Sequence, residues 1–380
     1  MKRWLYRQLA LNRAGLSIVV ALFAIAAGVG RWNGTFGVAI AVVAAALAVG
    51  ALKFFAFDAQ RALPPGRLWN VDGVRLHLFA EGRADRLRPV IWIAGGHGEG
   101  LVMAHLHRAI RDETRSILFD RAGAGWSGFG RLPLTIGDEL RHLRALLEAA
   151  SEPGPFVLAG HSFGGLFALN FAHRYPALVA GVVAMDPTSP ANITVAGPLS
   201  FHRLTRTAPW RALALQLGWR GASEVEIEDP HGIYRRCLEE WAETINRNSL
   251  QPRSVIAESA AFEGAMAVPY DVVSAPHALG DMPLTMLLAN PLPAEQQEMH
   301  GKVRELMGFD DVQEANFWAA IDASSEGQLQ LSRRARRVLA PEGSSHMFPY
   351  EHPDFVLDEV RRMISRSAAV ESAATDSPAR

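Results

Sequence analysis

The chain has 380 residues, a formal net charge of −1 and an apolar fraction of 49%, so its bulk is neither a disordered tail nor a polyanion-binding surface. It has no Lys/Arg block with interleaved aromatic residues, so we expect no nucleic-acid partner. The single cysteine, Cys237, excludes an internal disulfide framework and any multi-cysteine metal site.

Two uncharged apolar segments, 14–30 and 35–52, stand near the N-terminus and are separated by four residues. Each has about 17–18 residues, near the lower limit for crossing a ~30 Å hydrocarbon core. A signal peptide would not be followed directly by a second apolar segment, and a core hairpin would carry polar stripes. We therefore expect residues 1–60 to form a membrane hairpin of two transmembrane helices.

Basic residues flank the two apolar segments on their outer sides. They are Lys2, Arg3, Arg7 and Arg13 before the first segment, and Lys53, Arg61 and Arg67 after the second. Only Arg31 lies between the segments. By the positive-inside rule, this distribution places both flanks in the cytoplasm. We expect a multi-pass membrane protein whose remaining chain, from about residue 60 onward, is cytoplasmic.

From residue 68 the sequence alternates between strand-like and helix-like segments. Short apolar runs such as 89–96, 116–120, 155–160 and 181–186 alternate with segments of helical periodicity. This order predicts an α/β fold with a mostly parallel sheet flanked by helices. We expect a core of residues 66–187 and 281–366, a mainly helical insertion over 188–280, and a disordered tail over 367–380.

The clearest chemical motif is LAGHSFGG, in which Gly160, Ser162 and Gly164 form G-x-S-x-G. A nucleophile on a sharp strand-to-helix turn needs a strained backbone, and flanking glycines leave room for that turn. A buried strand precedes the motif and a helix follows it, which is the context that such a turn requires. Ser162 is therefore the candidate nucleophile.

At this point the sequence resembles the α/β-hydrolase superfamily over roughly residues 68–365. DRAGAGWSG at 120–128 resembles the loop that follows the fourth strand in that family, and AGGHGEG at 94–100 stands where the family has its oxyanion loop. The resemblance implies that Asp120 and Arg121 hold the first loop without being catalytic. It also implies that the insertion between strands 6 and 7 is the variable cap.

Acyl transfer needs two hydrogen-bond donors directed at the developing oxyanion. The resemblance implies the amide of Phe163 as one donor and that of Gly96 as the other, with His97 as the alternative. His97 and Glu99 on a glycine loop are too few ligands for zinc, so we expect no metal and no cofactor.

The order of triad residues in this superfamily is Ser, acid, His, so the general base must come late in the chain. His346 follows the last predicted strand by a short loop and resembles the family's base. His352 precedes a proline at the start of the closing helix, where a capping or surface role is more typical.

The acid is harder to assign, because the family usually places it after the seventh strand. In this sequence LTMLLAN at 284–290 is followed by no carboxylate until Glu295. The superfamily also accepts an acid after the sixth strand, where Asp186 stands in VVAMDPTSP. We therefore predict Asp186 as the acid and Glu295 as the alternative, and the remaining loop candidates are Asp310, Asp311 and Asp322.

A serine nucleophile implies acyl transfer, and we predict a carboxylic ester hydrolase acting on a small apolar substrate. Cleavage of a thioester, an amide or a carbon–carbon bond is the alternative within the fold. An alternative of another class is a non-catalytic, membrane-tethered binding or scaffold protein. That hypothesis, however, predicts that the residues of the catalytic triad would have been lost. The sequence indicates neither the natural substrate nor the oligomeric state.

Overall fold

The structure is a computed structural model that describes residues 2–11, 13–59, 62–83, 87–96, 98–132, 134–219, 232–267 and 273–375. At its centre is an eight-stranded sheet with strand order β1-β2-β4-β3-β5-β6-β7-β8. The strands are β1 Arg67–Val71, β2 Val74–Glu81, β3 Val90–Ile93, β4 Ser116–Phe119, β5 Phe156–His161, β6 Val179–Met185, β7 Leu284–Leu288 and β8 Ala335–Leu339. Only β2 pairs antiparallel with its neighbours, so the mostly parallel sheet predicted by the sequence is confirmed.

The antiparallel edge is made by a tight hairpin between β1 and β2. Asp72 and Gly73 both have positive φ, at 51° and 79°, which matches the turn that suits the twist of two paired strands. Val71 and Val74 close the hairpin as a directly opposed pair. An Asp-Gly pair is typical of such a turn, because both residues tolerate a positive φ.

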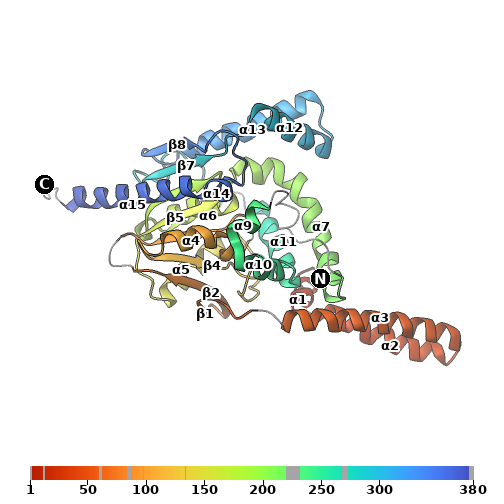
Figure 1. Ribbon diagram of the computed structural model, residues 1–380. Helices are drawn as coiled ribbons and strands as arrows, with labels where there is room; N and C mark the ends of the chain where they lie inside the picture. Colours follow the sequence, from red (N-terminus) through yellow and green to blue (C-terminus); the bar gives the residue numbers. More distant parts are fainter. Residues whose placement is uncertain are drawn as a thin grey trace.

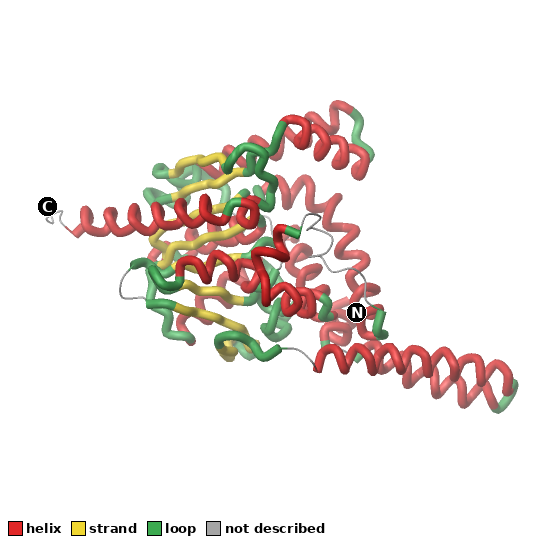
Figure 2. The backbone as a smooth tube through the Cα atoms, in the orientation of Figure 1, coloured by secondary structure: helices red, strands yellow, loops and turns green. Residues whose placement is uncertain are grey.

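Helices cover both faces of the sheet (Figure 1, Figure 2). Successive residues of β3 illustrate the two cores, because Ile91 packs in the cluster that contains α5 and α6 while Trp92 packs in the one that contains α4 and α15. The core helices are η1 Gly100–Met103, α4 Ala104–Ile110, α5 Ile136–Ala149, α6 Phe163–Arg174, η2 Pro176–Leu178, α14 Phe348–Glu351 and α15 Pro353–Thr375.

The segment between β6 and β7 is helical and is called the insert below. Its elements are η3 Asn192–Ala196, α7 Gly197–Gln216, α9 Ile233–Leu238, η4 Glu239–Trp241, α10 Ala242–Ser249 and α11 Pro252–Ala267. Figure 1 shows the insert on the side of the sheet where the parallel strands end, which is the edge where loops and ligands gather in α/β sheets. Between β7 and β8 the chain forms a second helical pair, α12 Pro293–Met307 and α13 Asp311–Leu329.

The N-terminal part consists of α1 Lys2–Ala10, α2 Ala14–Gly30 and α3 Gly34–Ala59. The helices α2 and α3 form a hairpin that projects from the body (Figure 1). At its tip the Asn33 side chain accepts a hydrogen bond from the Phe36 amide and caps α3, and a Cβ on Gly37 would collide with Gly30.

Two expectations for this part need correction. The second apolar helix is longer than 35–52, because α3 continues past Lys53 to Ala59. The segment before residue 14 does not belong to the hairpin. It forms α1, which packs on the insert and whose Tyr6 hydroxyl lies 3.0 Å from Glu263 and 3.3 Å from Ser259 of α11.

Among the described residues, one helix is long and apolar enough to cross a membrane, namely α3 over Gly34–Ala56. Its mean hydropathy is 2.4. The apolar helix α2 has only 17 residues, fewer than a typical membrane-spanning helix.

The prediction for the C-terminal tail also needs correction. Residues 367–375, predicted as disordered, continue α15 to Thr375, and Ser367 is buried. A helix that is already docked needs no new nucleation, and this segment is rich in alanine and has no proline before Pro378. The prediction for 376–380 lies outside the described residues.

Candidate active site

Ser162 occupies a sharp turn between β5 and α6. Its φ of 54° and ψ of −122° are costly for a residue with a Cβ, and such strain persists only where the surroundings impose it. The glycines of the motif are required by close approach: a Cβ on Gly160 would collide with the carbonyl of Gly164, and a Cβ on Gly164 with Ile93. The turn therefore presents the serine at the N-terminus of α6, where developing negative charge is favoured.

His346 and Asp186 meet beside this turn. The Nδ1 atom of His346, in the loop after β8, lies 2.5 Å from Oδ2 of Asp186, which directly follows β6. The Ser162 amide donates to the carbonyl of Met185, the neighbour of Asp186, at 2.9 Å. Three segments far apart in the sequence are thus brought together at one edge of the sheet.

The carboxylate of Asp186 is held in its charged form. Burial raises its pKa, but the hydrogen bond and positive charge of His346 and the Ala289 amide outweigh burial, so the pKa lies below its usual value. The Ala289 amide donates to Oδ1 at 3.4 Å. Ala289 directly follows β7, where the family usually has its acid, and here that position contributes a backbone donor.

Glu295 and the other candidate acids have different partners. Glu295 stands in the first turn of α12 and accepts a hydrogen bond from the Leu292 amide at 2.9 Å, so it caps that helix. Asp310 is the N-cap of α13 and accepts a hydrogen bond from the Gln313 amide at 2.8 Å, and Asp311 pairs with Arg304 on the surface. His352 lies between α14 and α15, where its amide ends α14.

His161 is a buried neighbour of His346 that the sequence analysis did not identify. Its Nε2 lies 2.9 Å from the carbonyl oxygen of His346, and the two rings are 4.6 Å apart. Burial, and then the charge of His346, lower the pKa of His161 to about 3. Because a carbonyl only accepts, the neutral imidazole donates from Nε2 and fixes the backbone that carries His346. In the sequence His161 is only the unspecified residue before the serine of G-x-S-x-G, so nothing there indicated this contact.

The loop after β3 lies against the serine. An ideal Cβ on Gly95 would lie 3.1 Å from Nδ1 of His161 and 3.2 Å from the Cβ of Ser162, so a side chain there would press on both residues. Gly96 has a positive φ of 53°, and its carbonyl accepts a hydrogen bond from Arg121. The guanidinium of Arg121 also lies 5.5 Å from the ring centre of Phe163, whose amide opens α6 and has no partner within that helix. His97 lies outside the described residues.

Arg121 is buried, as is Glu139 of α5. Burial lowers the pKa of Arg121, and the charges of Glu139 and Glu258 oppose the effect. Burial raises the pKa of Glu139 to about 7 against the opposing charge of Arg121. The buried Arg121 cation thus holds the loop that contains Gly96 through the Gly96 carbonyl. The resemblance likewise implied a structural role for Arg121.

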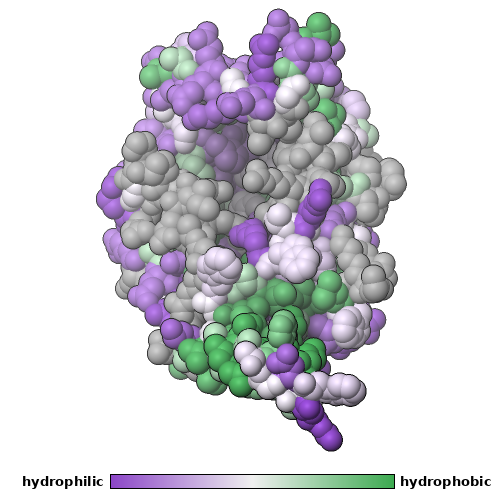
Figure 3. Space-filling view, turned by 90° about the vertical axis from the view of Figure 1, so that its right-hand side faces the viewer, coloured by the Kyte–Doolittle hydropathy of each residue, from purple (hydrophilic) through white to green (hydrophobic). Residues whose placement is uncertain are grey.

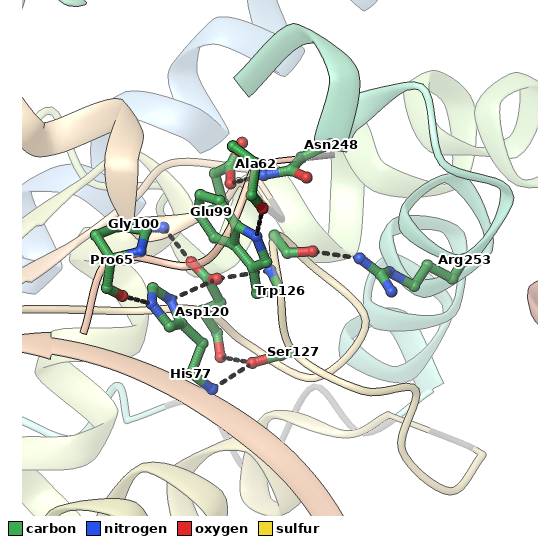
Figure 4. Close-up of polar contacts among 11 residues, drawn as sticks. Ala62, Pro65, His77, Glu99, Gly100, Asp120, Trp126, Ser127, Asn248 and Arg253 are labelled. Carbon is green, nitrogen blue, oxygen red and sulfur yellow. Dashed lines mark hydrogen bonds and ion pairs between the residues drawn. The ribbon is translucent and has the colours of Figure 1, made fainter. Parts of the chain in front are cut away.

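Asp120 organises the loop 120–128 (Figure 4). Its carboxylate accepts from the amides of Gly100 at 2.8 Å and Trp126 at 2.9 Å, and it pairs with Nδ1 of His77 at 2.8 Å. The Ser127 hydroxyl donates to its carbonyl at 2.7 Å. Asp120 therefore joins the loop after β3, the loop 120–128 and β2 in one buried network of hydrogen bonds.

The insert and the segment after α3 are attached to the same network (Figure 4). Asn248 of α10 donates to the buried Glu99 carboxylate at 2.6 Å, and Arg253 of α11 donates to the Gly125 carbonyl at 2.6 Å. The indole of Trp126 donates to the carbonyl of Ala62 at 3.0 Å. Within the described residues, no group of three or more His, Cys, Asp or Glu side chains is arranged to hold a metal ion.

The comparisons with known proteins agree with this architecture. The model of the "Alpha/beta hydrolase family" matches residues 90–359, more than half of the chain, so the chain belongs to that family and is a hydrolase. A thermophilic esterase from Thermogutta terrifontis superposes with a TM-score of 0.56 and 19% identity, over 80% of this chain and 99% of the esterase. An epoxide hydrolase from Bacillus megaterium superposes with a TM-score of 0.51 and 14% identity, over 79% of this chain and all of the hydrolase. At these identities the likeness shows the fold alone.

Among curated proteins, the chain is similar to an uncharacterized protein of Schizosaccharomyces pombe. The two are 34% identical over 234 residues, which is 58% of this chain and 41% of the relative. The chain spans about two fifths of the length of the curated relatives that it matches first.

Proposed function

We propose that this hydrolase is a serine carboxylic ester hydrolase in which Ser162 is the nucleophile, His346 the general base and Asp186 the acid. The observation that carries the proposal is the 2.5 Å contact between His346 and Asp186 beside the strained Ser162 turn. A carboxylate in that position holds the imidazole with Nδ1 protonated and Nε2 available to the serine.

The chemistry follows from these roles. Nε2 of His346 takes the proton from Oγ of Ser162, which attacks the ester carbonyl carbon. The amides of Phe163 and Gly96 stabilise the resulting oxyanion. The intermediate collapses to an acyl-enzyme, and the departing alkoxide takes the proton from His346. Water, deprotonated by the same imidazole, then attacks the acyl carbon and releases the acid and Ser162. No metal or cofactor takes part.

The neighbouring folds include epoxide hydrolases as well as esterases, and the residue at the turn separates these reactions. Opening an epoxide through an alkyl-enzyme ester needs a carboxylate nucleophile, whereas this chain has Ser162 at the turn. A serine supports acyl transfer, so the ester is preferred over the epoxide.

The proposal includes an apolar substrate, a cap and a membrane anchor. We assign residues 188–280 as the cap, and this assignment is supported by the position of the described insert helices on the side of the sheet where the parallel strands end (Figure 1). Helices α2 and α3 form a two-helix membrane hairpin, with both outer flanks and the hydrolase core in the cytoplasm. Reporter fusions at the C-terminus test this topology, since activity of a reporter that works only on the opposite side of the membrane would contradict it.

A fluorophosphonate probe tests the nucleophile, because it reacts with an activated serine. We expect labelling of the wild type at Ser162 and none in Ser162→Ala. Equal labelling of both, or no labelling of the wild type, would instead support a non-catalytic binding or scaffold protein. A panel of p-nitrophenyl esters, a thioester, an amide and a β-diketone then identifies the bond, and the ester should be cleaved with the largest kcat/KM.

A further inference from the structure

The end of α7 lies beside the apolar part of the N-terminal hairpin. The Gly15 amide, at the start of α2, donates to Oε1 of Gln216 at 2.6 Å. Gly50 of α3 packs so closely on the Leu217 carbonyl that a Cβ would not fit. Gly50 belongs to the uncharged stretch that ends before Lys53, so the chain at residues 216–218 lies at the depth of that stretch.

Three tryptophans on the segments that adjoin this contact are exposed. Trp219 follows directly and is 78% exposed, and Trp210 on α7 is 73% exposed. Trp4 on the adjoining α1 is 66% exposed. Tryptophan is enriched where hydrocarbon meets lipid headgroups, because its ring is apolar and its N–H bonds to water or headgroups. Exposed indoles at the base of an apolar hairpin match that layer.

Exposed basic residues accompany the tryptophans. Arg7 on α1, Arg13 before α2 and Lys53 on α3 are all exposed to solvent at the base of the hairpin. Cations at this depth are attracted to the anionic headgroups of a membrane surface. The collar, defined as Trp4, Trp210 and Trp219 with Arg7, Arg13 and Lys53, therefore combines the two chemistries of an interfacial site.

Figure 3 shows the face from which the hairpin projects. The hydrophobic residues in its lower half are mostly those of the hairpin itself, seen end-on, and the surface above them is hollowed. The insert belongs to this face and is tied to the site through Asn248–Glu99 and Arg253–Gly125.

We propose that the collar sits in the headgroup layer of an anionic bilayer, so that the insert and the active-site face rest on the membrane and the ester substrate is drawn from the lipid leaflet. The inference rests on the proposed hairpin and esterase, and it adds a second contact with the membrane, made by the insert itself. It also identifies the substrate class as an ester that partitions into the bilayer.

The test uses the full chain reconstituted in vesicles of phosphatidylglycerol and phosphatidylcholine. The variant Trp210→Ser/Trp219→Ser is compared with Trp32→Ser, which removes an indole 94% exposed at the far tip of the hairpin. Each protein is given a long-chain ester embedded in the bilayer and a short, water-soluble ester. We expect the double variant to lose about tenfold in kcat/KM on the embedded ester alone, and Trp32→Ser to lose nothing on either.

Two further measurements complete the test. Tryptophan emission that the double variant lacks should be quenched by lipids brominated near the headgroup end of the acyl chain. The rate on the embedded ester should fall when phosphatidylglycerol is replaced by phosphatidylcholine. No loss on the embedded ester, an equal loss on both esters, or unquenched emission would overturn the proposal.

These outcomes differ from a failure of the underlying function. If the hairpin does not insert, alkaline carbonate extracts the wild type from the vesicles. If the protein is not an esterase, Ser162→Ala and wild type behave alike on the soluble ester. A wild type that is membrane-bound and active, yet indifferent to Trp210 and Trp219, would refute the collar alone.

Discussion

The carboxyl edge of the sheet and the helical insert hold their polar side chains in different ways. Ser162 and Asp186 each end a buried parallel strand, so the hydrogen bonds of the sheet fix their backbones. The insert depends on separate polar contacts, such as Asn248 with Glu99 and Gln216 with Gly15. The difference suggests that changes at the sheet edge alter the chemistry, whereas changes in the insert alter how the site is assembled.

The largest effect is expected at the sheet edge from Ser162→Ala. Without the nucleophile no acyl-enzyme forms, so kcat on a p-nitrophenyl ester should fall by roughly 10⁴–10⁶-fold. Thermal unfolding should show a folded protein, because alanine removes only the hydroxyl at this position. A folded variant with near-normal kcat would mean that the chemistry occurs elsewhere.

The next effect distinguishes the two candidate acids. Asp186→Asn keeps the shape but allows the wrong tautomer of His346, and kcat should fall by about 10⁴-fold. Glu295→Gln is the matched control, because Glu295 follows the neighbouring strand β7 but caps α12. This variant should keep kcat within a factor of two of the wild type. The reverse pattern would transfer the role to Glu295.

These two carboxylates also show how far the sequence can be interpreted. The G-x-S-x-G motif predicted the turn, because its spacing is a local property of the backbone. Asp186 was preferred only because prolines and no acid follow the seventh strand, and its contact with His346 spans 160 positions of the chain. The spacing of residues in the sequence cannot show that two side chains so far apart in the chain are in contact.

Other features could not be predicted, for physical reasons. The contact of His161 with the His346 carbonyl joins the end of β5 to the loop after β8, two segments that are 185 positions apart in the chain. The pairing of Asn248 with Glu99 joins the insert to a glycine loop, and neither side has a recognisable motif. The helical end of α15 was missed because small polar composition was interpreted as disorder, although docking of the preceding turns sustains the helix.

The insert should respond to Asn248→Ala with a smaller effect. The change removes a hydrogen bond to a buried carboxylate and should lower the free energy of unfolding by about 1.5–3 kcal/mol. Because Glu99 adjoins the loop of Gly96, kcat/KM should also fall. Chemical denaturation and ester kinetics measure both quantities.

Glu243→Ala is the control on the same helix. It removes an exposed ion pair with Arg247, so the free energy of unfolding should change by less than about 0.5 kcal/mol and the kinetics should stay unchanged. If the two variants behaved alike, the contact of the insert with Glu99 would have no special role.

The smallest effect concerns pH. Because burial lowers the pKa of His161 from 6.5 to about 3, the unfolded chain binds a proton in that range that the folded chain does not. The free energy of unfolding should therefore fall as pH falls from 6.5 toward 3. In His161→Gln the denaturation midpoint should depend less steeply on pH over that window. An unchanged slope would show that the imidazole is protonated in the folded state.

The proposed function requires that ester cleavage pass through an acyl-enzyme on Ser162. Rapid acid quenching during turnover of a p-nitrophenyl ester, followed by mass spectrometry of the peptide that contains Ser162, tests it most directly. The account predicts that this peptide gains the mass of the acyl group, and that the acylated peptide accumulates in Asp186→Asn if deacylation slows more than acylation. Steady release of p-nitrophenol with an unmodified Ser162 peptide, or with the acyl group on another residue, would contradict it.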